Sequence, residues 1–478
     1  MASKSTVKKQ IRGFAFVWTA LTFMIGLMVF FAIYLTYDVE SSPVLAASSS
    51  DVMLPERQQP EEPEAVAPVS AQATPEAASQ PEEIQATAVA TISLSDFAAQ
   101  QAATPTPVPP VDTSDQFLVG VQVQEALDGD REGIQRVWMN DVGDMGLNWF
   151  KHQVRWYQIE PEPGVYNWTT LDLVLPIAQE YGYNVLASVV AAPDWARDPN
   201  IDLSAEGPPL DYQLFADFLQ VMLERYPGMI QAVEIWNEPN IDREWMAPEG
   251  VRAADFVNLV RLSAQAIKNV DPGIIVISGA PSPTGGFVDP ADGVMRAIND
   301  FDYIDQMIEA GVLDYIDCLG AHHNGYNVPP RYRWNEIPPR PDAQFRGPFD
   351  NPHHSWSFRS TLETYYNKVA VAGRPDIKLC VTEFGWASVD ELDGYPPNFG
   401  FAADNSLEDQ RDYTIEALDL MEEWGFVWIA IIWNLNYAPQ AGWSTESDNV
   451  PYSLIGPEFS KRPAFAAVRE WMDARADS

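Results

Sequence analysis

The sequence predicts an α/β protein, a (β/α)8 or TIM barrel, preceded by a single transmembrane helix and a disordered tether. Three features of the 478-residue chain carry this prediction: one long apolar segment without charge, one segment rich in Pro, Ala and Glu, and eight short apolar segments that alternate with helical patterns. A barrel of this type takes roughly 250 residues or more, so one folded domain accounts for the rest of the chain.

The N-terminal segments are typical of a membrane anchor. Residues 1–12 are basic, with four Lys or Arg residues and no acid, and residues 13–37 contain no charged side chain. The second segment is long enough to span a bilayer as a helix. The positive-inside bias then places residues 1–12 in the cytoplasm and the rest of the chain outside the cell membrane. A secreted protein is the alternative, because Val44-Leu45-Ala46 resembles a signal-peptide cleavage site.

Residues 38–115 form the predicted linker. Pro, Ala, Ser, Gln, Thr and Glu dominate this segment, and aromatic residues nearly vanish from it. Such a composition cannot bury enough apolar surface to offset the loss of chain entropy on folding. We therefore expect a disordered, extended tether that separates the membrane from a folded domain over residues 116–478.

The predicted domain contains eight short runs that are rich in β-branched and apolar residues, with helical patterns between them. The runs cover 117–123, 148–156, 184–192, 232–238, 274–280, 315–323, 377–385 and 427–435. Near-continuous apolar strands, each followed by a helix, predict a parallel sheet that is covered by helices, and eight of them fit a closed barrel. A doubly wound open sheet is the alternative, but no GxGxxG or P-loop motif supports a nucleotide-binding version.

The charge balance of the chain limits its partners. The chain carries 29 Lys and Arg residues against 68 Asp and Glu residues, a formal net charge of −39. Such an acidic surface repels phosphate, so no nucleic acid partner is expected. The adjacent His322 and His323 point to opposite faces of a strand and cannot easily share one ion, so no metal site is expected either.

Two carboxylates follow predicted strands at the edge where a barrel places its active site. Strand four ends in WNEPN (236–240) and strand seven ends in TEFGW (382–386). These strands lie on opposite sides of an eight-stranded barrel, so Glu238 and Glu383 are expected to face each other. The alternative is that both are solvated residues that happen to lie at strand ends. Two facing carboxylates are the machinery of glycoside hydrolysis, and their repulsion is expected to raise the pKa of the acid.

This pair of motifs resembles clan A of the retaining glycoside hydrolases, over residues 116–472. The resemblance implies that Glu238 is the general acid/base and that Glu383 is the nucleophile. It implies that Asn237 bonds the sugar 2-hydroxyl. It also implies a covalent glycosyl-enzyme and no cofactor.

Other positions extend the resemblance to the substrate site. The segment 155–168 is similar to the strand-two segment of the clan and implies that Arg155 bonds the nucleophile. In strand six the clan often has His-x-Tyr, which implies His322 as a site residue. This sequence departs from that pattern, because Tyr326 lies four residues after His322. Tyr326 remains the candidate partner of the nucleophile.

Aromatic residues supply the last candidates. Trp433, late in strand eight, matches the Trp that forms the floor of the sugar site, with a core position as the alternative. Trp195 follows strand three and fits the cleft wall or the core equally. Among the 16 Trp residues, Trp236 and Trp386 also fall at strand ends beside the two carboxylates, which favours sugar binding over core packing for them.

The two cysteines, Cys318 and Cys380, lie on neighbouring predicted strands. Side chains alternate along a strand. If Glu383 faces the barrel mouth, Cys380 faces the helices, and if His322 faces inward, so does Cys318. The sequence therefore predicts two free, buried thiols.

The expected protein is a membrane-anchored, extracytoplasmic glycosidase that hydrolyses O-glycosidic bonds of a β-linked oligo- or polysaccharide. The sequence resembles the β-xylosidase branch and the cellulase branch of the clan, and it does not indicate which of the two applies. A transglycosylase of wall or glycan assembly and an inactive carbohydrate-binding barrel are the alternatives. The long loops 327–356 and 436–459 either shape the sugar subsites or pack on the surface.

Overall fold

The computed structural model describes residues 116–127, 129–437, 444 and 447–476. The predicted transmembrane segment 13–37 and the predicted linker 38–115 lie outside these residues. Within the part of the chain that is described, no helix is both long and apolar enough to cross a bilayer.

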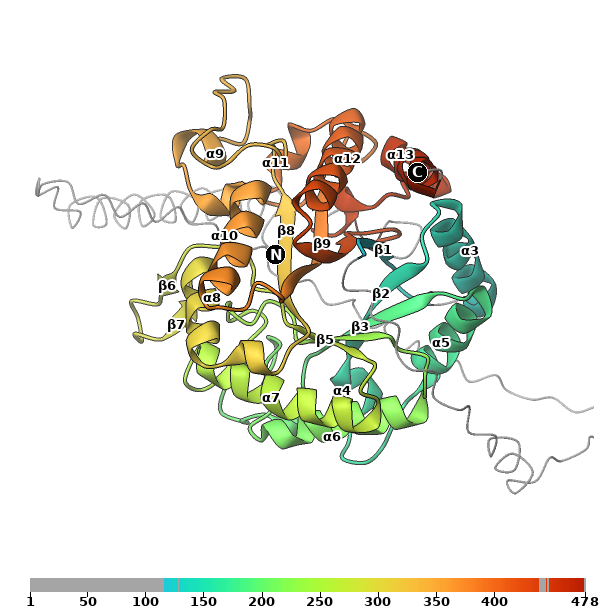
Figure 1. Ribbon diagram of the computed structural model, residues 1–478, viewed down its shortest axis with the longest axis vertical. Helices are drawn as coiled ribbons and strands as arrows, with labels where there is room; N and C mark the ends of the chain where they lie inside the picture. The colour runs from blue at the N-terminus through green and yellow to red at the C-terminus, as the bar shows by residue number, and fades with distance from the viewer. Residues whose placement is uncertain (1–115, 128, 438–443, 445–446, 477–478) are drawn as a thin grey trace, which may run out of the picture. The chain divides into compact units, whose positions relative to one another are not determined.

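Eight parallel strands close into a barrel in the order β1-β10-β9-β8-β5-β4-β3-β2, with helices around it (Figure 1). This confirms the predicted barrel, and each predicted strand segment contains or overlaps one of the eight. The barrel strands are β1 (Leu118–Gln122), β2 (Trp149–Arg155), β3 (Asn184–Val190), β4 (Ala232–Ile235), β5 (Ile275–Ser278), β8 (Cys318–Gly325), β9 (Lys378–Trp386) and β10 (Val427–Ile432). A small antiparallel hairpin of β6 (Phe287–Val288) and β7 (Met295–Ala297) lies between β5 and α8.

The helices of the described residues surround the strands. They are α3 (Arg131–Asp144), α4 (Trp156–Ile159), α5 (Thr169–Tyr181), α6 (Tyr212–Arg225), α7 (Ala253–Val270), α8 (Asp300–Glu309), α9 (Gly347–Asp350), α10 (Phe358–Val371), α11 (Gly400–Ala403), α12 (Leu407–Trp424) and α13 (Pro463–Ala476). Single 3-10 turns are η1 (Asp194–Ala196), η2 (Val312–Asp314), η3 (His354–Trp356), η5 (Val450–Tyr452) and η6 (Pro457–Phe459).

Helix α12 shows how local sequence sets these boundaries. Ser406 accepts a hydrogen bond from the Asp409 N–H, and the Asp409 carboxylate accepts one from the Ser406 N–H, which forms a capping box. The helix ends at Gly425, whose φ of 66° lies in the left-handed region that glycine adopts without a steric penalty. These two signals set the start and the end of α12.

The interior of the barrel is divided into an apolar and a polar layer. The apolar layer consists of Trp149, Leu186, Ala232, Ile277, Cys318, Cys380, Trp428, Ile429 and Ile431. Further along the same strands, toward their carboxyl ends, lie the buried polar side chains Lys151, Ser188, Glu234, His322 and Thr382. A barrel interior is normally filled with branched apolar side chains, so buried charges on three strands need a functional explanation.

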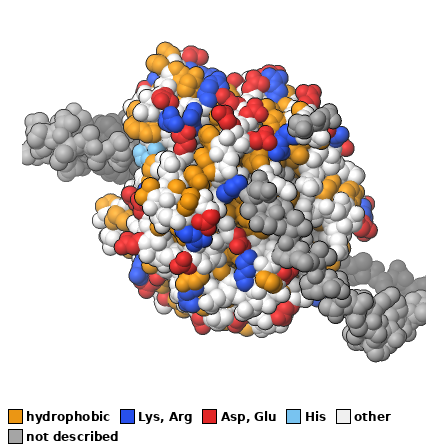
Figure 2. Space-filling view, in the orientation of Figure 1, with side chains coloured by type: hydrophobic (Ala, Val, Ile, Leu, Met, Phe, Trp, Pro, Cys, Tyr) orange, Lys and Arg blue, Asp and Glu red, His pale blue; other side chains and the backbone are white. Residues whose placement is uncertain are grey.

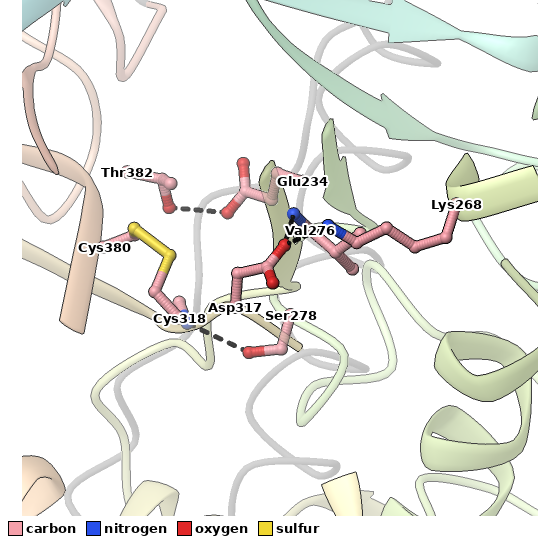
Figure 3. The surroundings of a disulfide bond; sticks show 9 residues. Glu234, Lys268, Val276, Ser278, Asp317, Cys318, Cys380 and Thr382 are labelled. Atoms are coloured by element: carbon pink, nitrogen blue, oxygen red, sulfur yellow. Dashed lines mark hydrogen bonds and ion pairs between the residues drawn. A yellow bond between two sulfur atoms is a disulfide. The ribbon is translucent and has the colours of Figure 1, made fainter. Parts of the chain in front are cut away.

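The cysteines are paired, so the prediction of two free thiols is wrong. Cys318 on β8 and Cys380 on β9 form a disulfide bond with a Cα–Cα distance of 5.8 Å (Figure 3). Both side chains are fully buried in the apolar layer of the barrel interior. The error lies in the assumption of strict alternation along β9.

A register shift on β9 breaks that alternation. Ala321 pairs with Val381, but the next residue of β8, His322, pairs with Glu383, so Thr382 is an extra residue in β9. An inserted residue of this kind reverses the direction of every side chain that follows it. Cys380 and Glu383 therefore both face the interior, although three positions separate them.

The disulfide makes a testable contribution to stability. The two cysteines are 62 residues apart in the sequence. Closing a loop of that length is worth about 4 kcal/mol in the chain-entropy model. We expect the Cys318→Ala/Cys380→Ala variant to lose unfolding free energy on this scale in urea denaturation. Reduction of the unfolded wild type is expected to add the mass of two hydrogens, and an unchanged mass would show that the thiols are free.

On the face drawn in Figure 2, the acidic residues that can be seen are spread over the surface. Their side chains lie scattered among Lys and Arg side chains. Several ion pairs of the protein join half-exposed partners, such as Arg136 with Glu132 and Arg469 with Asp473. On this face the charge is thus a general property of the surface and marks no single binding site.

Candidate active site

Glu238 and Glu383 both lie at the carboxyl ends of barrel strands and are nearly buried, with 8% and 6% of their surface exposed. Glu238 follows β4 with a φ of 39°, in the left-handed region that side chains with a Cβ rarely adopt. Its N–H donates to the Ala280 carbonyl at 3.0 Å, which fixes this backbone. Such conformations persist where the surrounding structure enforces them, often at functional sites.

His322 lies between the two carboxylates. Its Nδ1 atom is 3.3 Å from Glu238 Oε1 and 3.7 Å from Glu383 Oε2. Both carboxylates therefore lie within reach of one ring nitrogen, across the mouth of the barrel from each other. Retaining glycosidases hold their two carboxyl groups about 5 Å apart. The two distances to Nδ1 place Glu238 Oε1 and Glu383 Oε2 at most 7.0 Å from each other, which is compatible with that spacing. Sequence reasoning placed all three residues in the site.

Lys151 is a site residue that the sequence reasoning missed. This fully buried side chain of β2 lies with Nζ 3.1 Å from Glu383 Oε1 and 3.0 Å from Glu234 Oε2. Burial lowers the pKa of Lys151, but the Glu234 and Glu383 carboxylates outweigh burial and raise that pKa above its ordinary value. The available signal was a Lys in the middle of a strand predicted to be buried.

Glu234 completes this buried charge cluster from β4. Thr382 donates to Glu234 Oε1 at 2.5 Å (Figure 3). Burial alone would raise the pKa of Glu234, but Lys151, His322 and Thr382 lower it to about 2. Glu234 is therefore an ionised group beside Lys151 and His322. The sequence signal was again a charge within an apolar strand.

Among the described residues Arg155 forms no ion pair with Glu383, the contact that the resemblance implied. Its Nε lies 3.5 Å from Glu206 Oε1, whereas Lys151 holds Glu383. The reason is position along β2. Arg155 is the last residue of the strand and reaches the rim, while Lys151, four residues earlier on the same face, reaches into the interior beside Glu383.

Asn324, rather than Tyr326, is the hydrogen-bond partner of Glu383 on β8. Its Nδ2 donates to Glu383 Oε2 at 3.1 Å. Tyr326 follows the end of β8 and packs among Phe345, Trp356 and Phe401, and no hydrogen bond joins it to Glu383 among the described residues. Residues two apart on a strand share a face, so Asn324 occupies the Tyr position of a His-x-Tyr pattern that begins at His322.

The pKa of Glu238 is lowered, whereas repulsion between the carboxylates was expected to raise it. Burial raises this pKa, but the hydrogen bond with His322 and the charge of Arg243 outweigh burial. Arg243 donates from Nη2 to Glu238 Oε2 at 3.4 Å. The sequence argument counted two carboxylates and omitted the two basic groups that the fold brings beside one of them.

The remaining predicted substrate residues lie in different environments. Asn237 is buried, and among the described residues its Oδ1 has no hydrogen-bond partner. Trp433 follows β10, is 9% exposed and lies 5.2 Å from the Tyr437 ring. Trp195 is half-buried at 5.6 Å from the Trp156 ring and donates to the Glu160 carbonyl, which favours its core alternative.

Trp236 and Trp386 belong to the core, so the expectation that they hold sugar is wrong. Each is only 1% exposed. The Trp236 ring N–H donates to the Glu244 carbonyl at 2.9 Å, and the Trp386 ring N–H donates to the Val328 carbonyl at 3.0 Å. Both rings are therefore used in holding the loops behind the site. The sequence places both Trp residues at strand ends, but it does not show whether their side chains point into the site or into the core.

Of the two long loops, the structure describes 327–356 fully and 436–459 only in part. In 327–356, Phe345 and Trp356 pack around Tyr326. Tyr326 and Phe345 in turn pack against a buried cluster that includes Phe401, Tyr437 and Trp433. Trp334 of the same loop is 41% exposed. Part of 436–459, including Trp443, lies outside the described residues.

Comparisons with known proteins agree with this architecture. A family model described as beta-galactosidase, glycoside hydrolase family 42, matches residues 131–205, which include β2 and β3 but neither Glu238 nor Glu383. No curated protein matches the sequence. The matched segment is a small part of the chain, so the match does not assign the whole chain to this family.

Two solved structures share the fold. A family 39 glycoside hydrolase from the gut symbiont Bacteroides cellulosilyticus WH2 has a TM-score of 0.53 and 18% identity, and the match covers 76% of this chain and 65% of that one. The beta-glycosidase BGL167 has a TM-score of 0.51 and 17% identity, over 77% of this chain and 98% of that one. At these identities the likeness concerns the fold. The expected resemblance to glycoside hydrolase barrels is confirmed at the level of the fold.

Proposed function

We propose that this chain, a (β/α)8 barrel of the clan A glycoside hydrolase type, hydrolyses β-linked O-glycosidic bonds with retention of configuration. The observation that carries the proposal is the position of the Glu238 and Glu383 carboxylates on either side of His322 Nδ1, at 3.3 and 3.7 Å. A pair of this kind supports a double displacement, in which one carboxylate attacks the anomeric carbon and the other transfers the proton.

Glu383 is the proposed nucleophile. Lys151 contacts one of its oxygens and Asn324 donates to the other, so the carboxylate is fixed in orientation before substrate binds. Fixing the reacting group in this way removes much of the entropic cost of reaching the transition state. The attack forms a glycosyl ester on Glu383 and expels the leaving group.

Glu238 is the proposed acid/base, and Asn237 beside it is proposed to bind the sugar. The buried, unpaired Oδ1 of Asn237 suits a hydroxyl donor such as the sugar 2-hydroxyl. Trp433, with a small exposed part of its ring, is proposed as the floor on which the sugar face packs. An oligo- or polysaccharide is the proposed partner, and no cofactor has a role in this chemistry.

We further propose that the domain works outside the cytoplasm, attached to the membrane through residues 13–37. The disulfide between Cys318 and Cys380 supports this proposal, because disulfides persist in oxidising compartments and are rare in the cytosol. Release after cleavage near Ala46 is the competing outcome. N-terminal sequencing of the protein recovered from the membrane fraction distinguishes the two.

The test of the proposed activity is a screen of the detergent-solubilised full chain on aryl β-glucosides, β-galactosides, β-xylosides and β-mannosides, and on β-1,4-linked polysaccharides. The anomer formed first is detected by proton NMR. We expect the β-anomer to appear before mutarotation. An α-anomer formed first would contradict retention, and a lack of turnover on every substrate would support the inactive, carbohydrate-binding alternative. An added acceptor sugar shows whether transfer competes with hydrolysis.

A further inference from the structure

Glu238 is held between two basic groups, one on each of its oxygens. His322 Nδ1 lies 3.3 Å from Oε1, and Arg243 Nη2 lies 3.4 Å from Oε2. A guanidinium group keeps its protons in proteins, whereas an imidazole gains and loses one near neutral pH. Of these two neighbours, only His322 can therefore supply a proton to Glu238.

We propose that, between turnovers, His322 carries the proton that Glu238 gives to the leaving group. His322 holds this proton while Glu383 is negatively charged and releases it when Glu383 loses that charge. The inference rests on the proposed function and assigns the proton a location in the free enzyme. It gives His322 a role in proton transfer, beyond contact with the substrate.

The surroundings of His322 explain why a proton would reside there. The ring is fully buried, and Nδ1 faces Glu238 and Glu383 while Nε2 lies 3.7 Å from Glu234 Oε1. Burial lowers the pKa of His322, but Glu383, Glu234 and Glu238 outweigh burial and raise it to about 9. The charged and titratable groups around the site are Glu234 and Glu238 from β4 and its loop, Glu383 from β9, Lys151 from β2, Arg243 from the loop after β4, Tyr326 after β8, and Tyr437 and Tyr452 after β10.

The first step of the reaction then balances without an external proton. The Nδ1–H bond of His322 breaks and an O–H bond forms on Glu238 Oε1. Glu238 passes this proton to the glycosidic oxygen as the bond to the anomeric carbon breaks. Glu383 forms its bond to that carbon, and the leaving group departs as an alcohol. His322 ends neutral, Glu238 ends ionised, and Glu383 has lost its negative charge to the ester.

The second step restores the starting state. Water attacks the anomeric carbon, Glu238 accepts a proton from that water, and the ester bond to Glu383 breaks. The Glu383 carboxylate is ionised again, and the proton moves from Glu238 to His322. Among the groups that raise the pKa of His322, the charge of Glu383 is the largest. Loss and return of that charge therefore drive the proton off His322 and back onto it.

The first experiment measures this coupling without any substrate. In the full chain labelled with 15N-histidine, NMR titration follows the ring nitrogens, and His322→Asn identifies the signal. We expect His322 to keep its proton to about pH 9 in the wild type. In Glu383→Gln, which removes the charge but keeps the shape, we expect its pKa to fall by at least about one unit. An identical titration in both proteins would overturn the inference.

The second experiment separates proton storage from a structural role. His322→Gln keeps a hydrogen-bonding side chain but cannot carry the proton. We expect kcat/KM on an aryl glycoside with a poor leaving group to fall by about 10²-fold or more, and its alkaline limb to move about two pH units lower. A dinitrophenyl glycoside needs no protonation, so its rate should change little.

The control is His323→Gln on the same strand. His323 faces away from the site, with Nε2 3.1 Å from the Ser355 carbonyl, so its replacement should leave both profiles unchanged. Equal losses of His322→Gln on both leaving groups would mean that His322 only positions the site, and the inference would fail. A wild type that is inert on both substrates would instead count against the proposed function, and the NMR comparison would still decide the inference.

Discussion

Replacement of Glu383 by alanine is expected to reduce hydrolysis of an aryl β-glycoside by at least about 10⁴-fold, because no other carboxylate can form the glycosyl ester. The fold should persist, since the change removes one member of a cluster of charges and leaves Lys151 paired with Glu234. Circular dichroism and the urea midpoint check this point. The measurement is kcat under saturating substrate, beside wild type purified in parallel.

Azide distinguishes the role of Glu383 from that of Glu238. In Glu383→Ala, azide can occupy the vacated space and displace the aryl group once, which gives a glycosyl azide of inverted configuration. In Glu238→Ala, the ester on Glu383 still forms when the leaving group is good, and azide then replaces water, which gives a retained product. Two variants with the same product configuration would contradict the assigned roles. Loss of activity in Glu383→Ala smaller than about tenfold would contradict the nucleophile itself.

The fold was predictable because its signal is local. A strand covered on both faces is a continuous apolar run, and eight such runs with helices between them leave few topologies. Glu238 and Glu383 were predictable for a related reason. A carboxylate that directly follows an apolar strand of a barrel lies at the edge where active sites form.

The contacts of these carboxylates were not predictable, because they join distant parts of the chain. Lys151 and Glu383 are 232 residues apart in the sequence, and nothing near either residue indicates the other. The extra residue at Thr382 has no marker such as Gly or Pro, so alternation appeared to hold through β9 and misplaced Cys380. The lowered pKa of Glu238 likewise depends on His322 and Arg243, which only the folded barrel brings together.

Replacement of Lys151 by methionine is expected to reduce both stability and activity strongly. The side chain keeps its length, but Glu234 and Glu383 lose the cation they share in the barrel interior. Removal of one partner from a buried ion pair costs about 3–5 kcal/mol, because the remaining charge has no water to solvate it. We expect this loss of unfolding free energy in urea denaturation. We also expect kcat to fall by about 10²-fold, since Glu383 is no longer held in position.

The double variant Lys151→Met/Glu234→Gln shows whether the loss comes from the uncompensated charge. Neutralising Glu234 removes the carboxylate that Lys151 balances, so we expect at least about 1 kcal/mol of the lost stability to return. Activity should not return, because Glu383 still lacks Lys151. Arg411→Met is the control at the surface, where the pair with Asp412 is half-exposed on both sides and its loss should change the stability little. If the double variant were less stable than Lys151→Met, Lys151 would act mainly through packing. The buried charges of the barrel would then be independent of one another rather than one coupled network.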